Sequence, residues 1–156
     1  MQAGRLHPVV EALQALRGVQ RTVASTMVAA IGDLSRFDTP RELLKFLGLI
    51  PAEYSSGDRR QQGSMTQAGN TQARRALVEG AWAYRSPAKV SRHVQLRLEK
   101  PPKLLQDMSW KAHVRLCKRY RQLVARGKHA NIGTVASARE LAGFLGAIAT
   151  QLPLAA

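Results

Sequence analysis

The sequence predicts an all-α domain, and three observations support this. Apolar residues recur at the three- and four-residue spacing of amphipathic helices through most of the chain. Capping residues and glycines stand where these periodic segments begin and end. No alternating run of apolar and polar residues is long enough for a sheet, so any strands should be limited to a short β-hairpin within one polar segment.

The first two helices are expected at residues 8–16 and 23–34. The second should stop near Gly32, and "RGVQRT" forms a short break between them. Residues 8–48 resemble a helix-hairpin-helix unit, in which free backbone N–H groups at the hairpin hold a DNA phosphate. Gln20 stands where that pattern usually has a second glycine. An ordinary helical hairpin is therefore the alternative interpretation.

The third helix has clear start and stop signals within "DTPRELLKFLG". Thr39 can cap the helix, and Pro40 suits its first position. Glu42 completes a capping box with Thr39, and Gly48 ends the helix. These local signals predict a helix from about residue 40 to 47.

A helix is next expected from Asn70 through "NTQARRALVEGAWAYR", and another begins at Ser86 and Pro87. The segment "KPPK" at 100–103 separates the latter from the longest helix, expected over about 104–126 with Gly127 as its stop. The last apolar segment, up to Pro153, predicts a strongly buried helix. The predicted buried stripe of the longest helix is Leu105, Met108, Ala112, Leu116, Tyr120 and Val124.

Positive charge dominates the composition. The chain has 24 Lys and Arg against 10 Asp and Glu, a net charge of +14. Residues 1–57 carry six basic and five acidic side chains, whereas residues 58–156 carry eighteen and five. Such an excess favours a polyanionic partner, above all nucleic acid.

The interval from Met108 to Arg139 contains no acidic residue, and seven Lys or Arg lie within it up to Lys128. This makes it the main candidate for a phosphate-binding surface, the alternative being a solvated helix face. Trp110 and Tyr120 are interleaved with the cations, and we expect both to pack inside. The expected DNA- or RNA-binding residues here are Lys111, Arg115, Lys118, Arg119 and Arg121.

The sequence offers little support for metal or histidine chemistry. The ten acidic residues are scattered singly, so the converging carboxylates of a two-metal nuclease are not visible. The four histidines and Cys117 do not have zinc-ligand spacing, and a single cysteine forms no internal disulfide. No metal site is expected in this chain.

The segment "GLIPAEYSSGDRRQQGSMTQAGN", residues 48–70, is long and polar for a connection in a helical domain. It places Ser55 and Ser56 before Gly57, with Arg59 and Arg60 following. A serine hydroxyl can attack phosphorus if cations stabilise the developing charge. The alternative is a polar loop with incidental serines.

The ordered succession of "GDLSRFDTPRELLKFLGLIPAEYSSGDRRQQGSMTQAGNTQARRALVEGAW", "WKAHVRLCKRYRQLVARGK" and "VASARELAGF" resembles the C-terminal transposase domain of the insertion-sequence one-ten family, the Piv/MooV-type recombinases. The similarity covers about residues 13–148. It implies a DNA recombinase whose N-terminal RuvC-like domain binds Mg²⁺ through four acidic residues and whose C-terminal domain supplies a serine nucleophile. Members work as homo-oligomers, and some are guided by a structured bridge RNA.

The family's Ser-x-Gly pattern matches residues 55–57 and points to Ser55 as the nucleophile, with Ser56 as the alternate. The resemblance implies that Gly57, Gly63 and Gly69 shape the loop. It also implies a set of phosphate-contacting residues around the nucleophile: Arg59, Arg60, Thr66, Asn70, Arg74 and Arg75.

The RuvC-like domain is missing from this sequence, so we expect a single domain over residues 1–156. Its parts are the helix-hairpin-helix-like region 8–48, a serine loop at 49–69 and a basic helical part at 70–153. We expect it to bind DNA and to need its missing domain, with Mg²⁺, for recombination. The other class considered is a non-catalytic helical DNA- or RNA-binding module. The expected location is the cytoplasm of a bacterium or archaeon, at the nucleoid, with no membrane partner. The serine loop is expected to be loosely held until DNA and the missing domain close over it.

Overall fold

The structure is a computed structural model. It describes residues 3–33, 36–56, 59–65, 69–86 and 102–150, with the backbone alone for residues 3–6, 51–56 and 59–65. The elements in order are α1 (Ala3–Leu13), α2 (Arg21–Ile31), α3 (Pro40–Leu47), β1 (Pro51–Ser56), β2 (Arg59–Met65), α4 (Thr71–Ala81), the 3₁₀ helix η2 (Trp82–Arg85), α6 (Lys103–Ala125) and α7 (Ala130–Thr150).

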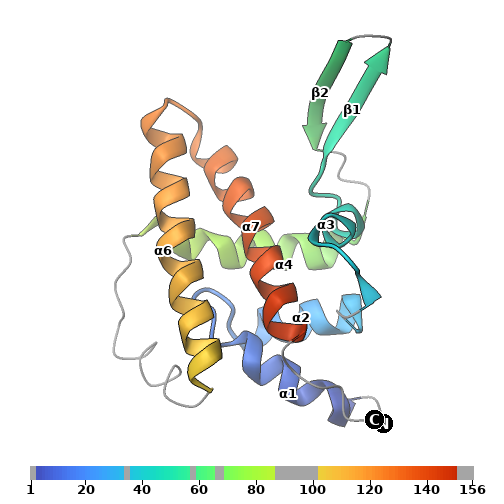
Figure 1. The fold of residues 1–156 in the computed structure, drawn as a ribbon, viewed down its shortest axis with the longest axis vertical. Helices are drawn as coiled ribbons and strands as arrows, with labels where there is room; N and C mark the ends of the chain where they lie inside the picture. Colours follow the sequence, from blue (N-terminus) through green and yellow to red (C-terminus); the bar gives the residue numbers. More distant parts are fainter. Residues whose placement is uncertain (1–2, 34–35, 57–58, 66–68, 87–101, 151–156) are drawn as a thin grey trace.

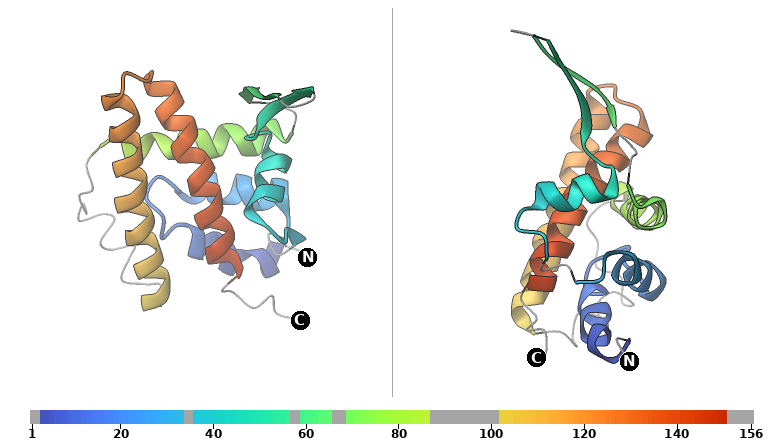
Figure 2. Two further views of the ribbon diagram at one scale, coloured as in Figure 1. Left: turned by 45° about the horizontal axis from the view of Figure 1, so that its top comes forward. Right: turned by 90° about the vertical axis from the view of Figure 1, so that its right-hand side faces the viewer.

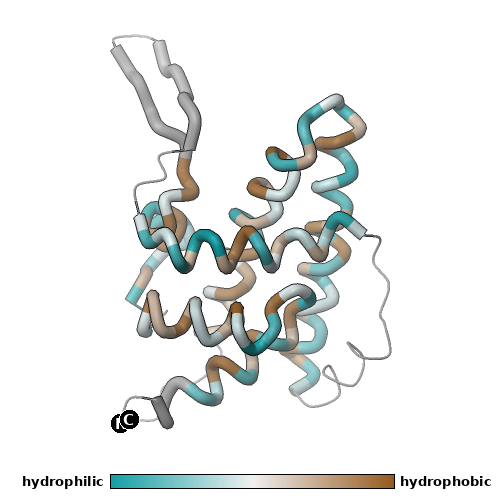
Figure 3. Tube along the Cα trace, turned by 180° about the vertical axis from the view of Figure 1, so that it is seen from behind, coloured by the Kyte–Doolittle hydropathy of each residue, from teal (hydrophilic) through white to brown (hydrophobic). Residues whose placement is uncertain are grey.

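The body of the molecule is helical, which confirms the predicted all-α class. The long helices α6 and α7 run side by side, and α4 crosses behind them (Figure 1). Helices α1 and α2 pack below this crossing, and α4 contacts both α2 and α7. Seen from behind, α2 and α4 carry interspersed polar and apolar residues, as expected for helices with one buried face (Figure 3). A single core therefore joins segments from both ends of the described chain.

Several predicted boundaries agree with the structure and others shift. Helix α1 begins at residue 3 rather than 8, continues through Pro8 and ends at Leu13, so Leu16 is buried in the following turn. Helix α2 ends at Ile31, just before Gly32, as the glycine predicted. The helix expected from Ser86 and Pro87 falls on residues 87–101, outside the described part of the chain.

The start and stop of α3 confirm the local signals. The Thr39 hydroxyl accepts the backbone N–H of Glu42 at 3.3 Å, and Gly48 ends the helix in the left-handed conformation, with φ 69°. The Glu42 carboxylate accepts the N–H of Asp38 at 3.0 Å, one residue before the position that a capping box predicts. The residues that directly flank α3, Thr39 and Gly48, thus cap its two ends.

The predicted buried stripe of α6 is correct except at its last position. Leu105, Ala112, Leu116 and Tyr120 are buried, and Met108 packs against the core. Val124, predicted to be buried, is exposed. Among the described elements, α4 crosses the α6–α7 pair below its upper end, and the last turn of α6 lies beside α7 alone (Figure 1).

Helix α7 is the most apolar element. By length and composition it could cross a membrane, but half of its apolar stretch is buried inside the fold. Its buried Thr134 and Ser137 hydroxyls donate to the carbonyls of Ala130 and Gly133 one turn earlier. The helix packs against α6, α4, α1, α3 and η2, and it is the buried core helix that the sequence predicted.

The turn between α1 and α2 packs on α4 through two glycines. Gly18 has φ 80°, a region that side-chain-bearing residues rarely adopt. A Cβ at Gly18 would overlap the carbonyl oxygen of Gly80 on α4 and lie 2.9 Å from the Cβ of Ala83. The helical hairpin is thus present, and its glycine serves close packing within the protein. Phosphate binding by the hairpin stays a prediction.

Replacing Gly18 with alanine should destabilise the protein by about 3 kcal/mol or more, because the new methyl group meets both a strained φ and the α4 backbone. Gly127→Ala is the matched control. Gly127 has φ 83° but nothing within 4 Å of the added Cβ, so only the conformational cost of about 1 kcal/mol applies. Urea unfolding of both variants measures the difference. Equal losses of unfolding free energy would mean that the contact with α4 is unimportant.

Candidate nucleic-acid interface and serine hairpin

The polar segment predicted to be a loop contains an antiparallel β-hairpin. In its register Ser55 lies opposite Arg60 and Ser56 lies opposite Arg59, with an irregularity between Pro51 and Glu53. The hairpin projects away from the helical body in two orientations (Figures 1 and 2). The short hairpin that the sequence allowed is therefore present. The expectation that the loop is loosely held is not tested.

The sequence also assigned roles in this segment to Gly57, Gly63 and Thr66. Gly63 lies within β2. Gly57 and Thr66 fall outside the described residues. Their predicted roles stay predictions.

The two ends of the hairpin are pinned together at α3. A Cβ at Gly69 would overlap the carbonyl oxygen of Phe46 and lie 2.7 Å from the backbone nitrogen of Gly48, so only glycine fits. The next backbone N–H, that of Asn70, donates to Phe46 O at 3.1 Å. The predicted loop-shaping role of Gly69 thus has a physical reason.

Asn70 and Arg74 also have structural tasks at this point. The Asn70 side chain accepts the N–H of Ala73 at 2.9 Å and caps α4. Arg74, which is half-buried, donates from Nη1 to Leu47 O at 3.3 Å. DNA contact by either residue stays a prediction. In the structure, both residues stabilise the junction between α3 and α4.

A hollow of about 400 Å³ lies at the base of the hairpin. Its walls are mainly apolar, and Arg74, Arg75 and Glu79 contribute its charges. Of the two arginines, Arg75 is exposed. Trp82, also in this wall, is 37% exposed and carries the Arg85 guanidinium 4.2 Å from its ring centroid. Arg75 thus places a positive charge, accessible to solvent, near the base of the serine hairpin.

The predicted basic surface is on α6, and its five proposed contact residues are all exposed. Four of them line a groove of about 630 Å³ along α6, whereas Arg121 lies outside it. Residues three and four apart share a helix face, which explains why the basic side chains gather here. The groove residues are Trp110, Lys111, Val114, Arg115, Lys118, Arg119, Gln122 and Glu140.

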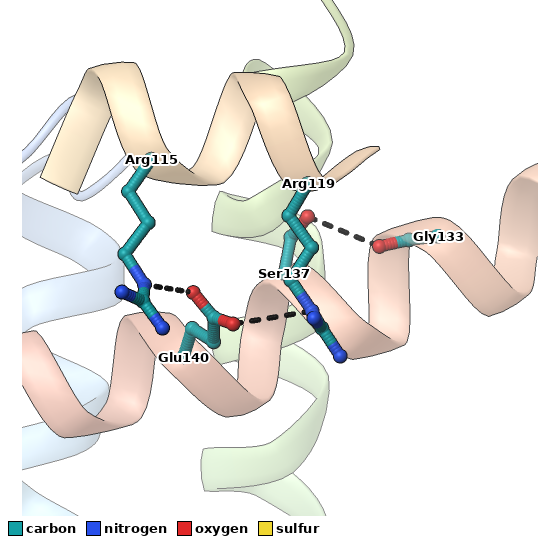
Figure 4. Close-up of polar contacts among 5 residues, drawn as sticks. All are labelled: Arg115, Arg119, Gly133, Ser137 and Glu140. Carbon is teal, nitrogen blue, oxygen red and sulfur yellow. Dashed lines mark hydrogen bonds and ion pairs between the residues drawn. The ribbon is translucent and has the colours of Figure 1, made fainter. Parts of the chain in front are cut away.

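Two of these arginines share one carboxylate from α7 (Figure 4). The Arg115 Nε donates to one oxygen of Glu140 at 2.8 Å, and the Arg119 Nε lies 3.1 Å from the other. The hydrogen bond and the negative charge of Glu140 raise the pKa of Arg115 above its already high ordinary value. This Arg115–Glu140–Arg119 cluster, the Glu140 fork, joins α6 to α7. Its carboxylate offsets part of the positive charge of the basic surface on α6.

Sequence reasoning missed the Glu140 fork and the exposure of Trp110. Trp110 was expected to pack inside, but 46% of it is exposed, whereas Tyr120 is buried as predicted. The signal for the fork was available. Glu140 is the first acid after the acid-free interval, and it lies on the apolar helix that should pack against the basic one.

The described residues form no evident metal site. Within them, no group of three or more His, Cys, Asp or Glu could hold a metal ion. Cys117 is buried and donates to Ser86 O at 3.2 Å, and burial raises the pKa of its thiol. The cysteine therefore stays protonated and packs as a small core residue.

Several known proteins are similar to this chain in sequence. Residues 10–95 match the family described as Transposase IS116/IS110/IS902 family. A Sinorhizobium fredii protein named as a transposase, y4qE, is 45% identical over 146 residues, covering 94% of this chain and 37% of its own length. A Pseudomonas aeruginosa protein named as a family 20 transposase is 34% identical over 47% of the chain and 22% of its own length. A Coxiella burnetii transposase for the insertion sequence element IS1111A is 32% identical over 56% of the chain and 22% of its own length. The chain thus spans less than two fifths of these relatives.

Glu140→Gln should tighten binding of duplex DNA a few-fold at low salt, because it removes the one carboxylate among the cations lining the groove. Glu79→Gln is the control, since it makes the same change in net charge at the hollow beside the hairpin. Fluorescence anisotropy with a labelled duplex measures both. An unchanged or weaker affinity in Glu140→Gln alone would mean that the groove does not contact DNA or needs the fork intact.

Proposed function

The chain belongs to the IS116/IS110/IS902 family of transposases, and we propose that it is the DNA-binding and serine-nucleophile domain of such an enzyme. The observation that supports this most is the hairpin register. It sets Ser55 opposite Arg60 and Ser56 opposite Arg59 on a hairpin that projects from the body. Directly opposed residues of an antiparallel ladder have Cα atoms about 4.5–5.5 Å apart. Each serine thus has a cationic residue as its nearest cross-strand neighbour.

In the proposed reaction the hydroxyl oxygen of Ser55 attacks the scissile phosphate. A serine–phosphorus bond forms and the phosphorus–O3′ bond breaks, which leaves a 5′-phosphoserine link and a free 3′-hydroxyl. The serine proton passes to solvent as the bond forms, and the departing O3′ takes up a proton from solvent. Arg59 and Arg60 would stabilise the negative charge that gathers on the phosphate oxygens. Attack by the 3′-hydroxyl of a second strand on the phosphoserine would rejoin the DNA and restore the serine.

The helical body would hold the DNA on which the hairpin acts. Lys111 and Lys118 in the groove and Arg121 beside it are exposed cations. Arg115 and Arg119 would add to this surface only in part, because Glu140 shares their charge. Cations that neutralise phosphates release counterions, so binding should weaken as salt rises.

The proposal extends to parts of the enzyme outside these 156 residues. Mg²⁺ would be held by the acidic residues of a RuvC-like domain, and this chain would supply the serine and the phosphate-binding cations. A homo-oligomer and, in some members, a guide RNA belong to the same expectation. The protein would act on DNA at the nucleoid, in the cytoplasm.

A second candidate function is a non-catalytic helical module that binds DNA or RNA. One observation favours it: α6, with the basic groove, lies on the opposite side of the body from the hairpin in two views (Figures 1 and 2). The groove could therefore bind a polyanion without involving either serine. The two functions differ in one respect, which is whether a serine hydroxyl becomes covalently linked to DNA.

Ser55→Ala should abolish the covalent protein–DNA adduct, with a loss of at least about a thousandfold, because the attacking oxygen is removed. The adduct is measured on a denaturing gel with end-labelled DNA, after reconstitution of the chain with a full-length family transposase. Ser64→Ala, on the facing strand of the hairpin, is the matched control and should keep the adduct. Loss in Ser56→Ala alone would move the nucleophile to Ser56. An adduct in the Ser55→Ala/Ser56→Ala double variant would refute the serine mechanism.

A further inference from the structure

Trp110 occupies an unusual position for a large aromatic residue. It is 46% exposed, and Val114, one turn further along α6, is 43% exposed. Both line the groove that also contains Lys111 and Lys118. The proposed phosphate-binding surface therefore includes apolar area that DNA phosphates alone would leave uncovered.

The indole of Trp110 rests against a ring that is itself fixed in place. Trp110 and His113 meet edge to face, with ring centroids 5.5 Å apart and planes at 68°. His113 is buried, and its Nε2 lies 2.7 Å from Nη1 of Arg17 in the turn after α1. Burial, and then the charge of Arg17, lowers the pKa of His113. The imidazole is therefore neutral near pH 7, and its Nε2 accepts the Arg17 hydrogen bond.

Tyr84 packs on His113 as well, edge to face with ring centroids 6.0 Å apart. The ring behind Trp110 is thus held from the α1–α2 turn and from η2. An exposed aromatic side chain with a rigid support loses little conformational freedom when a ligand stacks on it.

We propose that Trp110 is a stacking platform for an unpaired base, and that the groove along α6 binds single-stranded DNA. Single-strand-binding surfaces combine a cationic groove that follows the backbone with aromatic side chains on which bases stack. The groove has four cations and one carboxylate, and Lys118 lies about 12 Å along the helix axis from Trp110. Lys111, next to Trp110 in sequence, and Lys118, about two turns further along α6, would bind phosphates of the strand as it continues from the stacked base.

A duplex would use this groove less well. Its bases are stacked on one another, so their faces reach an aromatic side chain only after unstacking. The inference rests on the proposed function, because cleavage and rejoining of strands by a transposase would expose unpaired DNA. That function is also why we assign DNA rather than RNA to the groove.

The fluorescence of the protein gives a direct test. The chain has two tryptophans, so Trp82→Phe leaves Trp110 as the only source of tryptophan fluorescence. Adding oligothymidylate to the 156-residue Trp82→Phe chain should quench its emission, because a stacked base contacts the indole. A duplex of equal length should quench it less. Absence of quenching at DNA concentrations that saturate anisotropy would overturn the proposal.

Affinity measurements separate stacking from charge. Trp110→Ala should weaken oligothymidylate binding about tenfold and duplex binding less than about twofold, whereas Trp110→Phe should keep most of the single-strand affinity. Trp82→Ala, at the other exposed tryptophan, is the control and should leave the preference for single strands unchanged. Thermal unfolding checks that the alanine variants fold, and the phenylalanine variant tests the proposal even if they do not.

The remaining outcomes are also decisive. Equal effects of Trp110→Ala on single-stranded and duplex DNA, or no effect on either, would refute the stacking platform while leaving the proposed function intact. Tighter binding of oligouridylate than of oligothymidylate would overturn the assignment to DNA. If neither single-stranded nor duplex DNA binds, the DNA-binding part of the proposed function fails instead.

Discussion

The position of the serine hairpin depends on one backbone contact. Gly69 lies against the backbone of residues 46–48, and the N–H of Asn70 donates to Phe46 O. This contact brings the two ends of a long polar segment together at the C-terminal end of α3. Because α3 ends at Gly48 and α4 is capped by Asn70, the hairpin leaves the body between two helices whose termini are fixed. An isolated two-stranded hairpin is only marginally stable in water. The attachment at α3 therefore adds stability that the two strands alone do not provide.

In the proposed function the helical body binds DNA and the hairpin supplies the nucleophile. In the hairpin the serines lie opposite arginines, and the body has a basic groove along α6, the helix that lies across the body from the hairpin (Figure 1). DNA long enough to reach both would be held by many phosphate contacts along α6 and attacked at one point by the hairpin. The close packing of the α1–α2 turn on α4, and the links from that turn to α6 through Arg17 and His113, make the body a single packed unit. The hairpin would then act from a rigid support.

Features encoded by neighbouring residues were predicted from the sequence, and features that depend on contacts between residues far apart in the chain were not. Thr39 and Gly48 determine the ends of α3 within a few residues of themselves, so their signals were readable. The apolar period of α6 predicted its buried face for the same reason. Glu140 meets its arginines only after α7 has packed on α6, and the exposure of Trp110 depends on what other helices leave uncovered. Neither follows from local pattern, and both alter the interpretation of the basic surface.

The central claim is that a serine of β1, Ser55 or its neighbour Ser56, carries the atom that becomes linked to DNA, and the most direct measurement locates that link. Trypsin cleavage of the covalent complex after Lys45 and Arg59 would release the peptide that contains both serines. After nuclease digestion, fragmentation mass spectrometry would show which residue of the peptide keeps a nucleotide. The account predicts the nucleotide on Ser55. A nucleotide on Tyr54, or on any residue outside residues 46–59, would contradict it.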